Sequence, residues 1–441
     1  METLTRRRFA LGAAALGLSL PFARPLLAAE FSSDGSGDQS TGLAEAMAKA
    51  AAAGQPLFLA GGTYRIADVA VPDNLKMTGI PGLTVLALAS GGNSILKGTA
   101  SANVTLEGIS FDGAGGSGDA PLVDFTDLTE LSVSGCRFSH AAVNALSLSQ
   151  CGGRVENCTF TDSGSVAIFA TDSRGLAVTS NRIDGCGNGG ILVWRSEAGS
   201  DGTIVMSNRI ADIDWRGGGN GQNGNGINVF RADGVIIASN HISGCAFSAV
   251  RINAGRNNQV TGNTCLDCGE TAIFSEFGFS GSAIANNVID GAATGISIAN
   301  LDSDGHLATC TGNIVRNIAP VSRTNPDTTP VGIFAEADVA ITGNVVEGVP
   351  GPAIVAGWGP YLRNVLVSSN VVRDADIGIA VSVAEGAGSA QVTGNIIDAR
   401  GPALAGMAWT DTVSANLADD AGRFPNVTVG GNQQAVKPAL P

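Results

Sequence analysis

The sequence predicts an all-β protein: a right-handed parallel β-helix solenoid of about a dozen coils with a short N-terminal capping helix. Asparagines recur every 23 to 32 residues from position 181 onward, and a fixed period in this range is typical of a solenoid. Short β-branched runs alternate with Gly, Asn and Asp turns in these repeats, without helical periodicity. Glycine supplies 61 of the 441 residues, about twice the ordinary share, which fits the many turns of such coils.

Composition and charge exclude several classes of protein. The 25 Lys and Arg residues against 39 Asp and Glu residues give a formal charge of −14, whereas nucleic-acid-binding proteins normally carry a basic face. Hydrophobic residues make up 44% of the chain, which is enough for a core and argues against a disordered chain. We therefore expect a folded acidic protein without a nucleic-acid partner.

Residues 1–29 have the order of segments that defines a signal peptide. The basic segment Thr5–Phe9 (Thr-Arg-Arg-Arg-Phe) precedes the apolar run Ala10–Leu20 and the small residues Ala28 and Ala29. The adjacent arginines resemble a twin-arginine export signal, which predicts a periplasmic or secreted protein without stable membrane insertion after cleavage. An N-terminal anchor that stays attached is the alternative. Removing residues 1–29 changes the formal charge from −14 to −17, because four arginines and one glutamate leave.

Residues 30–95 are expected to form the N-terminal cap and the first coils. The alanine-rich run from Thr41 to Ala53 predicts a helix, and the run from Pro56 to Ile66 predicts a strand, a glycine turn and a second strand. The open end of a β-helix exposes its core and unpaired strand edges, so it needs a cover. The helix is the candidate for that cover.

Residues 96–420 are expected to form the coils, most of which place an asparagine at the same turn. Valine, isoleucine or cysteine stands three residues before and two residues after each such asparagine. An asparagine tolerates a left-handed turn, and its amide can pair with the amide one coil away, at ~4.8 Å. We therefore assign a structural role to Asn181, Asn208, Asn240, Asn263, Asn287, Asn313, Asn344, Asn370 and Asn395. Residues 421–441, which contain three prolines, are expected to be an irregular tail.

The eight cysteines are not expected to form a disulfide framework or a zinc site. They are dilute in a long chain, whereas disulfide scaffolds are short and rich in cysteine. Cys265 and Cys268 form the only Cys-x-x-Cys pair, and no second pair or matching histidines complete a zinc site. We expect the cysteines to be small apolar core residues.

The Thr-Arg-Arg-Arg-Phe segment, the cap and the asparagine repeats together resemble a bacterial family of twin-arginine-translocated repeat proteins within the pectate-lyase-like parallel β-helix superfamily. The resemblance covers essentially the whole chain. It implies the fold and export but no particular activity, because the superfamily contains polysaccharide lyases, hydrolases and epimerases as well as non-catalytic members.

Two columns of outward side chains run along the strand that opens each coil. Outward positions of a solenoid are ordinarily small and polar, but here aromatic residues, arginines and carboxylates follow one another on consecutive coils. The first column holds Leu192, Asn228, Arg251, Phe274, Ser297, Phe334 and Val355, and the second holds Trp194, Phe230, Asn253, Glu276, Ala299, Glu336 and Gly357. Insertions at 211–226 and 319–330 flank this face, and long loops in a repeat array are usually functional or disordered.

This face is the candidate polysaccharide-binding site. Trp194, Trp215 and Phe230 are expected to stack on sugar rings. The polar candidates for contacts with sugar hydroxyls or carboxylates are Arg195, Asp214, Asn228, Arg231 and Asn253. The alternative is structural, with Trp194 and Phe230 packed beneath the inserted loops.

Arg251, Glu276 and Glu336 are the candidate catalytic residues. Glu276 and Glu336 share a column two coils apart, about 9.6 Å by twice the strand spacing, near the separation of acid and base in an inverting glycoside hydrolase. For a lyase, Arg251 is the candidate base, with Ca²⁺ on Asp212 and Asp214 neutralising a uronate. An ordinary Arg251–Glu276 ion pair is the competing interpretation.

The predicted function is that of a monomeric exported β-helix protein that binds an acidic or neutral polysaccharide on the face formed by residues 192–336 and cleaves it as a lyase or hydrolase. No metal-binding residue is assigned, and Ca²⁺ is the only cofactor considered. The alternative is a non-catalytic carbohydrate-binding or cell-envelope structural repeat protein. In that case the aromatic residues are covered and each charge is singly paired.

Overall fold

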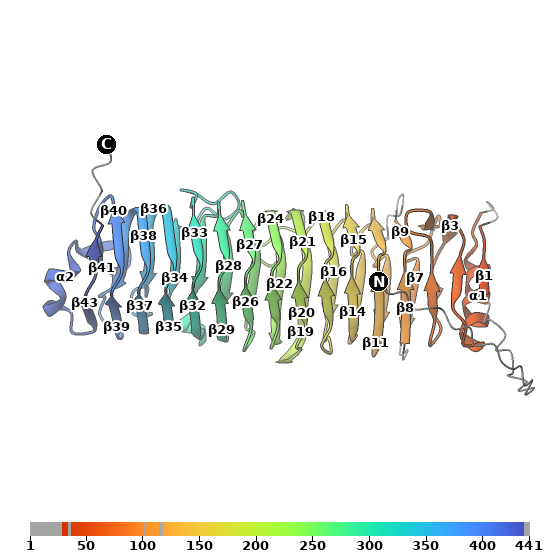
Figure 1. Cartoon of the computed structure of the whole chain (residues 1–441), viewed down its shortest axis with the longest axis horizontal. Coiled ribbons are helices and arrows are strands. Elements are labelled where there is room, and N and C mark those ends of the chain that lie inside the picture. Colours follow the sequence, from red (N-terminus) through yellow and green to blue (C-terminus); the bar gives the residue numbers. More distant parts are fainter. Residues whose placement is uncertain (1–28, 34–36, 100–102, 114–115, 117, 436–441) are drawn as a thin grey trace, which may run out of the picture.

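A computed structural model describes residues 29–33, 37–99, 103–113, 116 and 118–435. Within them the chain forms one long right-handed β-solenoid, with helix α1 (Ser40–Ala52) at one end and helix α2 (Leu417–Asp420) at the other (Figure 1). The predicted signal peptide lies outside the described residues except for Ala29. No helix in the described part of the chain is long and apolar enough to span a membrane.

The predicted fold class is confirmed, with more coils than expected. Sheet A takes one strand from each coil, and its strands from β2 to β43 number fifteen in the described chain, so about fifteen coils replace the predicted dozen. The prediction was low because the first coils carry no asparagine at the repeated turn. Sheet A consists of β1 (Ala29–Phe31), β2 (Leu57–Leu59), β5 (Lys76–Thr78), β8 (Asn103–Glu107), β11 (Glu130–Ser134), β14 (Gly153–Glu156), β17 (Ala177–Thr179), β20 (Ile204–Met206), β23 (Ile236–Ala238), β26 (Gln259–Thr261), β29 (Ser280–Ala285), β32 (His306–Thr311), β35 (Ala337–Thr342), β37 (Arg363–Ser368), β39 (Ala390–Thr393) and β43 (Val427–Gly430).

A second sheet contains two stacks, which we call B1 and B2, joined through the long strands β36 (Val345–Ala356) and β38 (Val371–Ser382). Stack B1 consists of β3 (Gly62–Ile66), β6 (Thr84–Leu88), β9 (Ser110–Asp112), β12 (Arg137–Ser139), β15 (Thr159–Thr161), β18 (Arg182–Cys186), β21 (Arg209–Ile213), β24 (His241–Cys245), β27 (Thr264–Leu266), β30 (Val288–Asp290), β33 (Ile314–Arg316), β40 (Ile396–Ala399) and β44 (Gln433–Gln434). Stack B2 consists of β4 (Val69–Ala70), β7 (Leu96–Thr99), β10 (Val123–Thr126), β13 (Leu146–Ser149), β16 (Val166–Thr171), β19 (Gly189–Ser200), β22 (Asn225–Asp233), β25 (Val250–Asn253), β28 (Thr271–Glu276), β31 (Thr294–Ile298), β34 (Val331–Ala335), β41 (Leu404–Ala408) and β42 (Asp411–Ser414), of which only β42 pairs antiparallel.

The N-terminal cap is where the sequence indicates it. Helix α1 spans Ser40–Ala52, one residue earlier than predicted, and buries Leu43, Met47 and Ala50. These side chains belong to the same continuous apolar core as the first coils. The helix therefore covers the open end of the solenoid, as a β-helix end requires.

The asparagine ladder holds neighbouring coils together. Each side-chain Nδ2 donates to the Oδ1 one coil further on, from Asn181 to Asn208 (3.0 Å) and onward to Asn395. The predicted ladder residues are buried, so these bonds satisfy amides that water does not reach. The ladder extends one coil beyond the prediction, because Asn395 donates to Asn432 (2.8 Å).

The core between the sheets is apolar and contains the cysteines. Phe111, Phe138 and Phe160 stack with ring centroids 4.9 and 4.7 Å apart on consecutive coils. All eight cysteines are buried and free of disulfide bonds, as expected for small core residues. Buried residues alternate with more exposed ones along strands such as β6, β11 and β13.

The C-terminal segment departs from the prediction of an irregular tail over 421–441. After the 3₁₀-helix η2 (Ala421–Arg423), β43 pairs with β39 and β44 pairs with β40. The alternation of Val427, Thr428 and Val429 forms one more strand, and Asn432 takes the ladder position. Pro425 precedes this strand and does not interrupt it, because proline is tolerated outside the ladder of hydrogen bonds. Residues 436–441 lie outside the described residues.

Candidate functional site

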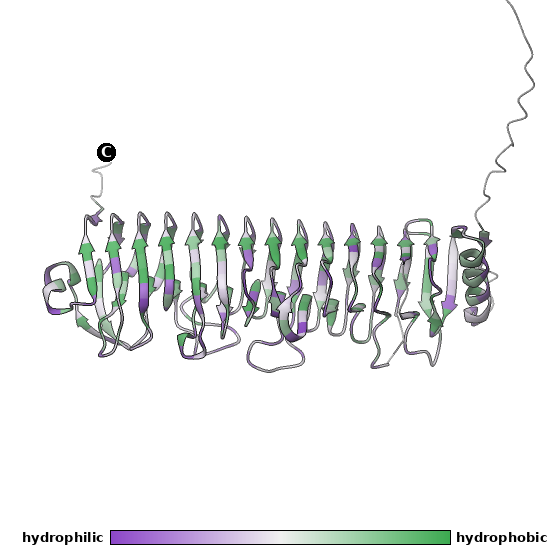
Figure 2. Cartoon of the chain, turned by 90° about the horizontal axis from the view of Figure 1, so that it is seen from below, coloured by the Kyte–Doolittle hydropathy of each residue, from purple (hydrophilic) through white to green (hydrophobic). Residues whose placement is uncertain are grey.

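The predicted face lies on stack B2, and its strands are paired as the two columns require. The register joins Leu192, Asn228, Arg251, Phe274, Ser297, Phe334 and Val355 in this order on successive coils. It also joins Trp194, Phe230, Asn253 and Glu276. Long loops project from one side of the solenoid (Figure 2), and the insertions 211–226 and 319–330 both contact residues near Arg251.

Arg251 is held by two carboxylates. Its Nε and Nη2 donate to Glu276 Oε1 and Oε2 at 2.6 and 2.7 Å, and its Nη1 donates to Glu270 Oε2 at 3.0 Å. Burial opposes the charge of the guanidinium, but the hydrogen bonds and charges of Glu276 and Glu270 prevail and raise the pKa of Arg251. These contacts disfavour Arg251 as a base, and an Arg251–Glu276 ion pair is present, although it is buried and not at the surface.

The carboxylate of Glu276 is likewise fully engaged in hydrogen bonds. Besides both bonds from Arg251, its Oε1 accepts a hydrogen bond from Asn253 Nδ2 at 2.9 Å, and the residue is 3% exposed. Three hydrogen bonds from Arg251 and Asn253 therefore hold this carboxylate within the coil. These contacts indicate that Glu276 neutralises the charge of Arg251. We therefore do not propose it as the second catalytic carboxylate beside Glu336.

The loop 211–226 covers this cluster. Asn225 Nδ2 donates to the carbonyl of Gly221 at 2.8 Å, which fixes the loop over the coil. Gly221 has φ +114°, and a Cβ there would lie 2.1 Å from Arg251 Nη1, so only glycine allows this close contact. Asn228, a predicted sugar-binding residue, is 4% exposed. Its Nδ2 lies 3.5 Å from the carbonyl oxygen of Gln222, which belongs to this loop. The loop thus closes the central part of the predicted face.

The aromatic residues of strands β16, β19 and β22 pack on one another. Trp194 makes edge contacts with Phe169 and Phe230, with ring centroids 5.2 and 5.7 Å apart. Its indole Nε1 is buried. The Arg231 guanidinium lies 4.8 Å from the centre of the Phe230 ring and donates to the carbonyl of Ser196. These contacts engage both rings, although Trp194 and Phe230 remain partly exposed, and they favour the structural interpretation for this cluster.

The remaining predicted sugar-binding residues lie apart from one another. Arg195 donates to the carbonyl of Glu197 at 3.2 Å. Asp214 pairs with Arg216 at 3.0 Å, and the Trp215 backbone N–H and this pair hold the pKa of Asp214 below its ordinary value. Trp215 donates to the carbonyl of Gly219 within its own loop and packs against Phe247. These residues stabilise loops and strand ends.

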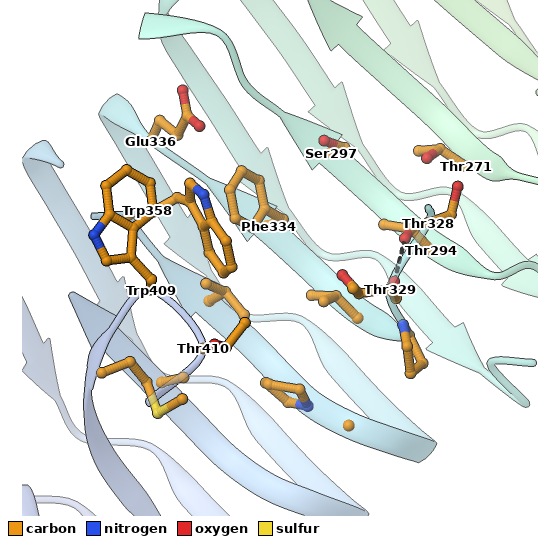
Figure 3. A pocket seen from close by; sticks show the side chains of 18 of the residues that line it. Thr271, Thr294, Ser297, Thr328, Thr329, Phe334, Glu336, Trp358, Trp409 and Thr410 are labelled. Carbon is orange, nitrogen blue, oxygen red and sulfur yellow. Dashed lines mark hydrogen bonds between the residues drawn. The ribbon is translucent and has the colours of Figure 1, made fainter. Parts of the chain in front are cut away.

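An open groove lies further along the same face, toward the C-terminal end. It has a volume of about 620 Å³, runs over strands β28 to β41 of stack B2, and is bounded by residues 325–330 of the second loop. Figure 3 shows Phe334 on its floor, Glu336, Trp358 and Trp409 at one end, and Thr328 and Thr329 at the other. Of the predicted catalytic residues only Glu336 lines it; Glu270, which was not predicted, lines it as well.

Trp358 and Trp409 form the aromatic wall of the groove. Their rings meet edge to face with centroids 5.7 Å apart, and the two residues are 36% and 47% exposed. Gly359 has φ +56°, and a Cβ there would lie 2.6 Å from the Trp409 ring, so glycine permits this packing. Two indoles from turns about fifty residues apart are therefore fixed side by side at the surface.

Glu336 is a buried carboxyl at the same end of the groove. The residue is 7% exposed, and the Leu301 backbone N–H donates to its Oε2 at 2.7 Å. Burial raises the pKa of Glu336 to about 7, against the lowering effect of that hydrogen bond. Near neutral pH this carboxyl therefore exists in both protonation states and can donate as well as accept a hydrogen bond.

The second loop is attached to the Arg251 cluster. Asn325 Nδ2 donates to Glu270 Oε1 at 2.8 Å, and Thr324 Oγ1 donates to the carbonyl of Ala246 at 2.8 Å. At the groove itself, Thr294 Oγ1 donates to the carbonyl of Thr329 at 2.9 Å (Figure 3). The charge cluster thus positions the loop that forms one edge of the groove.

Sequence reasoning located the face but missed the groove's aromatic wall. Trp358 directly follows Gly357, the last residue of the second predicted column. Including the next residue along the chain at that coil would therefore have found it. Trp409 follows strand β41 by one residue and stands at a turn with φ +58°. The scarcity of tryptophan, four in the whole chain, was the other available signal.

The structure offers no cluster of metal-ligating side chains in its described residues, counted as three or more His, Cys, Asp or Glu close together. Asp212 and Asp214 line a separate hollow with Arg323. The pairing of Asp214 with Arg216 and the neighbouring Arg323 disfavour a Ca²⁺ site there, because the cation would meet positive charge.

Comparison with known proteins identifies the architecture. A family model described as "Right handed beta helix region" matches residues 89–221 and 154–317, which together cover more than half of the chain. PfbA, a surface adhesin of Streptococcus pneumoniae, superposes with a TM-score of 0.51 at 14% identity over 84% of this chain and 89% of its own. The Dettilon tailspike protein gives 0.50 at 16% identity over 93% and 67%, and the pre-mature gene product 12 of bacteriophage phi29 gives 0.50 at 13% over 82% and 65%. No curated protein sequence matches the chain.

Proposed function

The chain belongs to the right-handed β-helix family, and from its groove we propose that it is an exported protein that binds a polysaccharide. The observation that carries this proposal is the pair of exposed indoles, Trp358 and Trp409, fixed beside Glu336 over an open groove of about 620 Å³. Exposed aromatic residues grouped in a groove with a few polar groups are typical of a binding site.

The chemistry of the groove suits sugar rings. An indole offers a flat apolar face with an N–H at one edge, which complements the apolar face and hydroxyl rim of a pyranose. Thr271, Thr328 and Thr410 contribute hydroxyls along the lining, and a hydroxyl both donates and accepts hydrogen bonds. The groove is open and continues over several coils, so it accommodates a chain of sugars rather than an isolated monosaccharide.

Export through the twin-arginine pathway is part of the proposal. Thr5–Phe9 and the apolar run behind it support it, as does the resemblance to twin-arginine-translocated repeat proteins. A periplasmic or secreted location gives the groove access to envelope or extracellular polysaccharides. Among the structures of similar fold, PfbA is a surface adhesin; the proposal itself rests on the groove.

Binding is tested with the purified protein on a panel of soluble polysaccharides by affinity gel electrophoresis and calorimetry. Trp358→Ala and Trp409→Ala are expected to abolish the retardation that the unmodified protein shows. Phe277→Ala is the matched control, because Phe277 is an aromatic residue 43% exposed on β-helix surface outside the groove lining. Retention of binding in both tryptophan variants would contradict the proposed site.

A second candidate function, glycoside hydrolysis, is favoured by one observation at Glu336. A carboxyl with a pKa raised to about 7 by burial is suited to donate a proton to a leaving sugar oxygen near neutral pH. Asp327, an exposed carboxylate in the loop that lines the groove, is the candidate base in place of Glu276. New reducing ends that disappear in Glu336→Gln would support hydrolysis, and binding without new reducing ends would support the non-catalytic function.

A further inference from the structure

The ionisable side chains of the groove are all acidic. Glu270, Asp327 and Glu336 belong to its lining, and no Lys, Arg or His does so among the described residues. The formal charge of the whole chain is −14, so the net charge of the protein also disfavours an anionic ligand. A ligand carboxylate or sulfate placed there would meet like charges at short range.

Arg251, which packs against the lining residue Phe274, does not supply the missing positive charge. The Nε and Nη2 of Arg251 donate hydrogen bonds to Glu276, and its Nη1 donates to Glu270. One guanidinium is thus paired with two carboxylates. Phe274, whose ring lies 4.9 Å from the Arg251 Cζ, lines the groove itself and stands between the two. The single positive charge of the cluster is therefore paired with two carboxylates and is not free to bind a uronate.

The other cations near the loop are also engaged away from the groove. Arg323 donates to the carbonyl of Asp267 at 2.6 Å and lines the separate hollow beside Asp214. Arg363 pairs with Asp338. The neutral lining groups are chiefly aromatic rings, aliphatic side chains and hydroxyls, together with the Asn325 amide, which donates to Glu270. Such groups bind hydroxylated rings without a charge.

We propose that the groove selects a neutral glycan and rejects polysaccharides that carry uronate or sulfate groups. This inference rests on the proposed function, since it names the substrate class of the same groove. It narrows the expectation from the sequence, which left acidic and neutral polysaccharides open. The discriminating element is repulsion by Asp327, Glu336 and the Glu270–Arg251–Glu276 cluster, a specificity obtained by disfavouring the wrong ligand.

The test uses pairs of oligosaccharides that differ only in charge. Neutral β-glucan, α-glucan and galactan oligosaccharides are titrated against the protein beside the same oligosaccharides oxidised at C6 to uronates, with alginate and polygalacturonate as natural polyanions. The titrations are made at pH 8, where Glu336 is ionised because its pKa lies at about 7. We expect one neutral oligosaccharide to bind and its oxidised form to bind at least about tenfold more weakly, with the difference reduced in high salt because ions screen the repulsion.

Variants locate the repulsion. Asp327→Asn and Glu336→Gln are expected to narrow the gap between neutral and oxidised ligand, while Glu197→Gln, which removes an exposed carboxylate from the distant strand β19, leaves it unchanged. An oxidised ligand that binds as tightly as its neutral form, or a gap that neither groove variant narrows, overturns the proposed selectivity while leaving polysaccharide binding intact. If no oligosaccharide of either kind binds, the proposed function falls and this inference falls with it.

Discussion

Arg251 and Glu276 form a bidentate salt bridge, with Nε–Oε1 at 2.6 Å and Nη2–Oε2 at 2.7 Å. Both residues are less than a tenth exposed. The outward columns of a solenoid ordinarily face solvent, but here the loop 211–226 covers the pair. The ion pair is therefore buried. It is connected to the second loop, residues 319–330, because Arg251 also donates to Glu270, which accepts a hydrogen bond from Asn325.

Breaking this pair is expected to destabilise the protein strongly. Glu276→Gln leaves the buried Arg251 with one carboxylate, and removing one partner of a buried pair typically costs about 3–5 kcal/mol. The unfolding midpoint in urea measures the change. Glu347→Gln is the control, because it breaks the exposed Arg373–Glu347 pair (2.8 Å) and is expected to cost no more than about 1 kcal/mol. Equal effects of the two variants would show that the Arg251 cluster is not buried as described.

The asparagine ladder predicts a second stability effect. Asn287→Ala removes the acceptor of the Asn263 backbone N–H and side chain and the donor to Asn313, so several buried polar groups lose their partners. Each orphaned group costs about 1–3 kcal/mol, and thermal unfolding should show the loss. Asn103→Ala breaks an exposed amide pair with Asn74. It should change the free energy of unfolding by no more than about 0.5 kcal/mol.

The protonation of Glu336 predicts a pH dependence of stability. The pKa is about 7 in the folded protein against an ordinary value of 4.5, so at intermediate pH the folded state holds a proton that the unfolded state has released. Stability is therefore expected to fall as pH rises from about 4.5 to 7 and to level off above 7, by a total on the order of 3 kcal/mol. Glu336→Gln should remove this part of the slope, since Gln keeps an acceptor for the Leu301 N–H. A variant with the same slope as the parent protein would refute this assignment.

The aromatic wall predicts a loss of affinity. Trp409→Ala removes an indole that is 47% exposed and packed on Trp358, and truncation of such an anchor typically costs 2 kcal/mol or more, about a thirtyfold rise in Kd. Calorimetry with the neutral oligosaccharide found in the panel measures it. Trp194→Phe, in the aromatic cluster of β16, β19 and β22 outside the groove, should leave Kd unchanged. A larger effect of Trp194→Phe than of Trp409→Ala would place the site on that cluster instead.

The fold was accessible from the sequence because each coil repeats a local signal. One asparagine with apolar residues three places before and two places after it was enough to predict the ladder and the register from Leu192 to Val355. The number of coils was underestimated because the first coils carry no asparagine at this turn. The last coil escaped the prediction because Asn432 lies among residues assigned to a tail.

The site was less accessible because it depends on contacts that no period encodes. The approach of Trp358 to Trp409 depends on two turns, and the closure over Arg251 depends on how the loop with Gly221 folds back. Glu270 stands in a turn outside both columns, yet it bonds Arg251 and Asn325. The columns identified Glu336, whereas the partners that bury Arg251 and Glu276 came from outside them.

The most direct test of the groove is a crystal structure of the protein with the neutral oligosaccharide that binds most tightly in the panel. We predict a sugar ring stacked on Trp358 or Trp409, with the chain of sugars running over Phe334 toward Thr328. A sugar bound instead at the cluster of Trp194 and Phe230, or an empty groove with binding elsewhere, would contradict the proposed function.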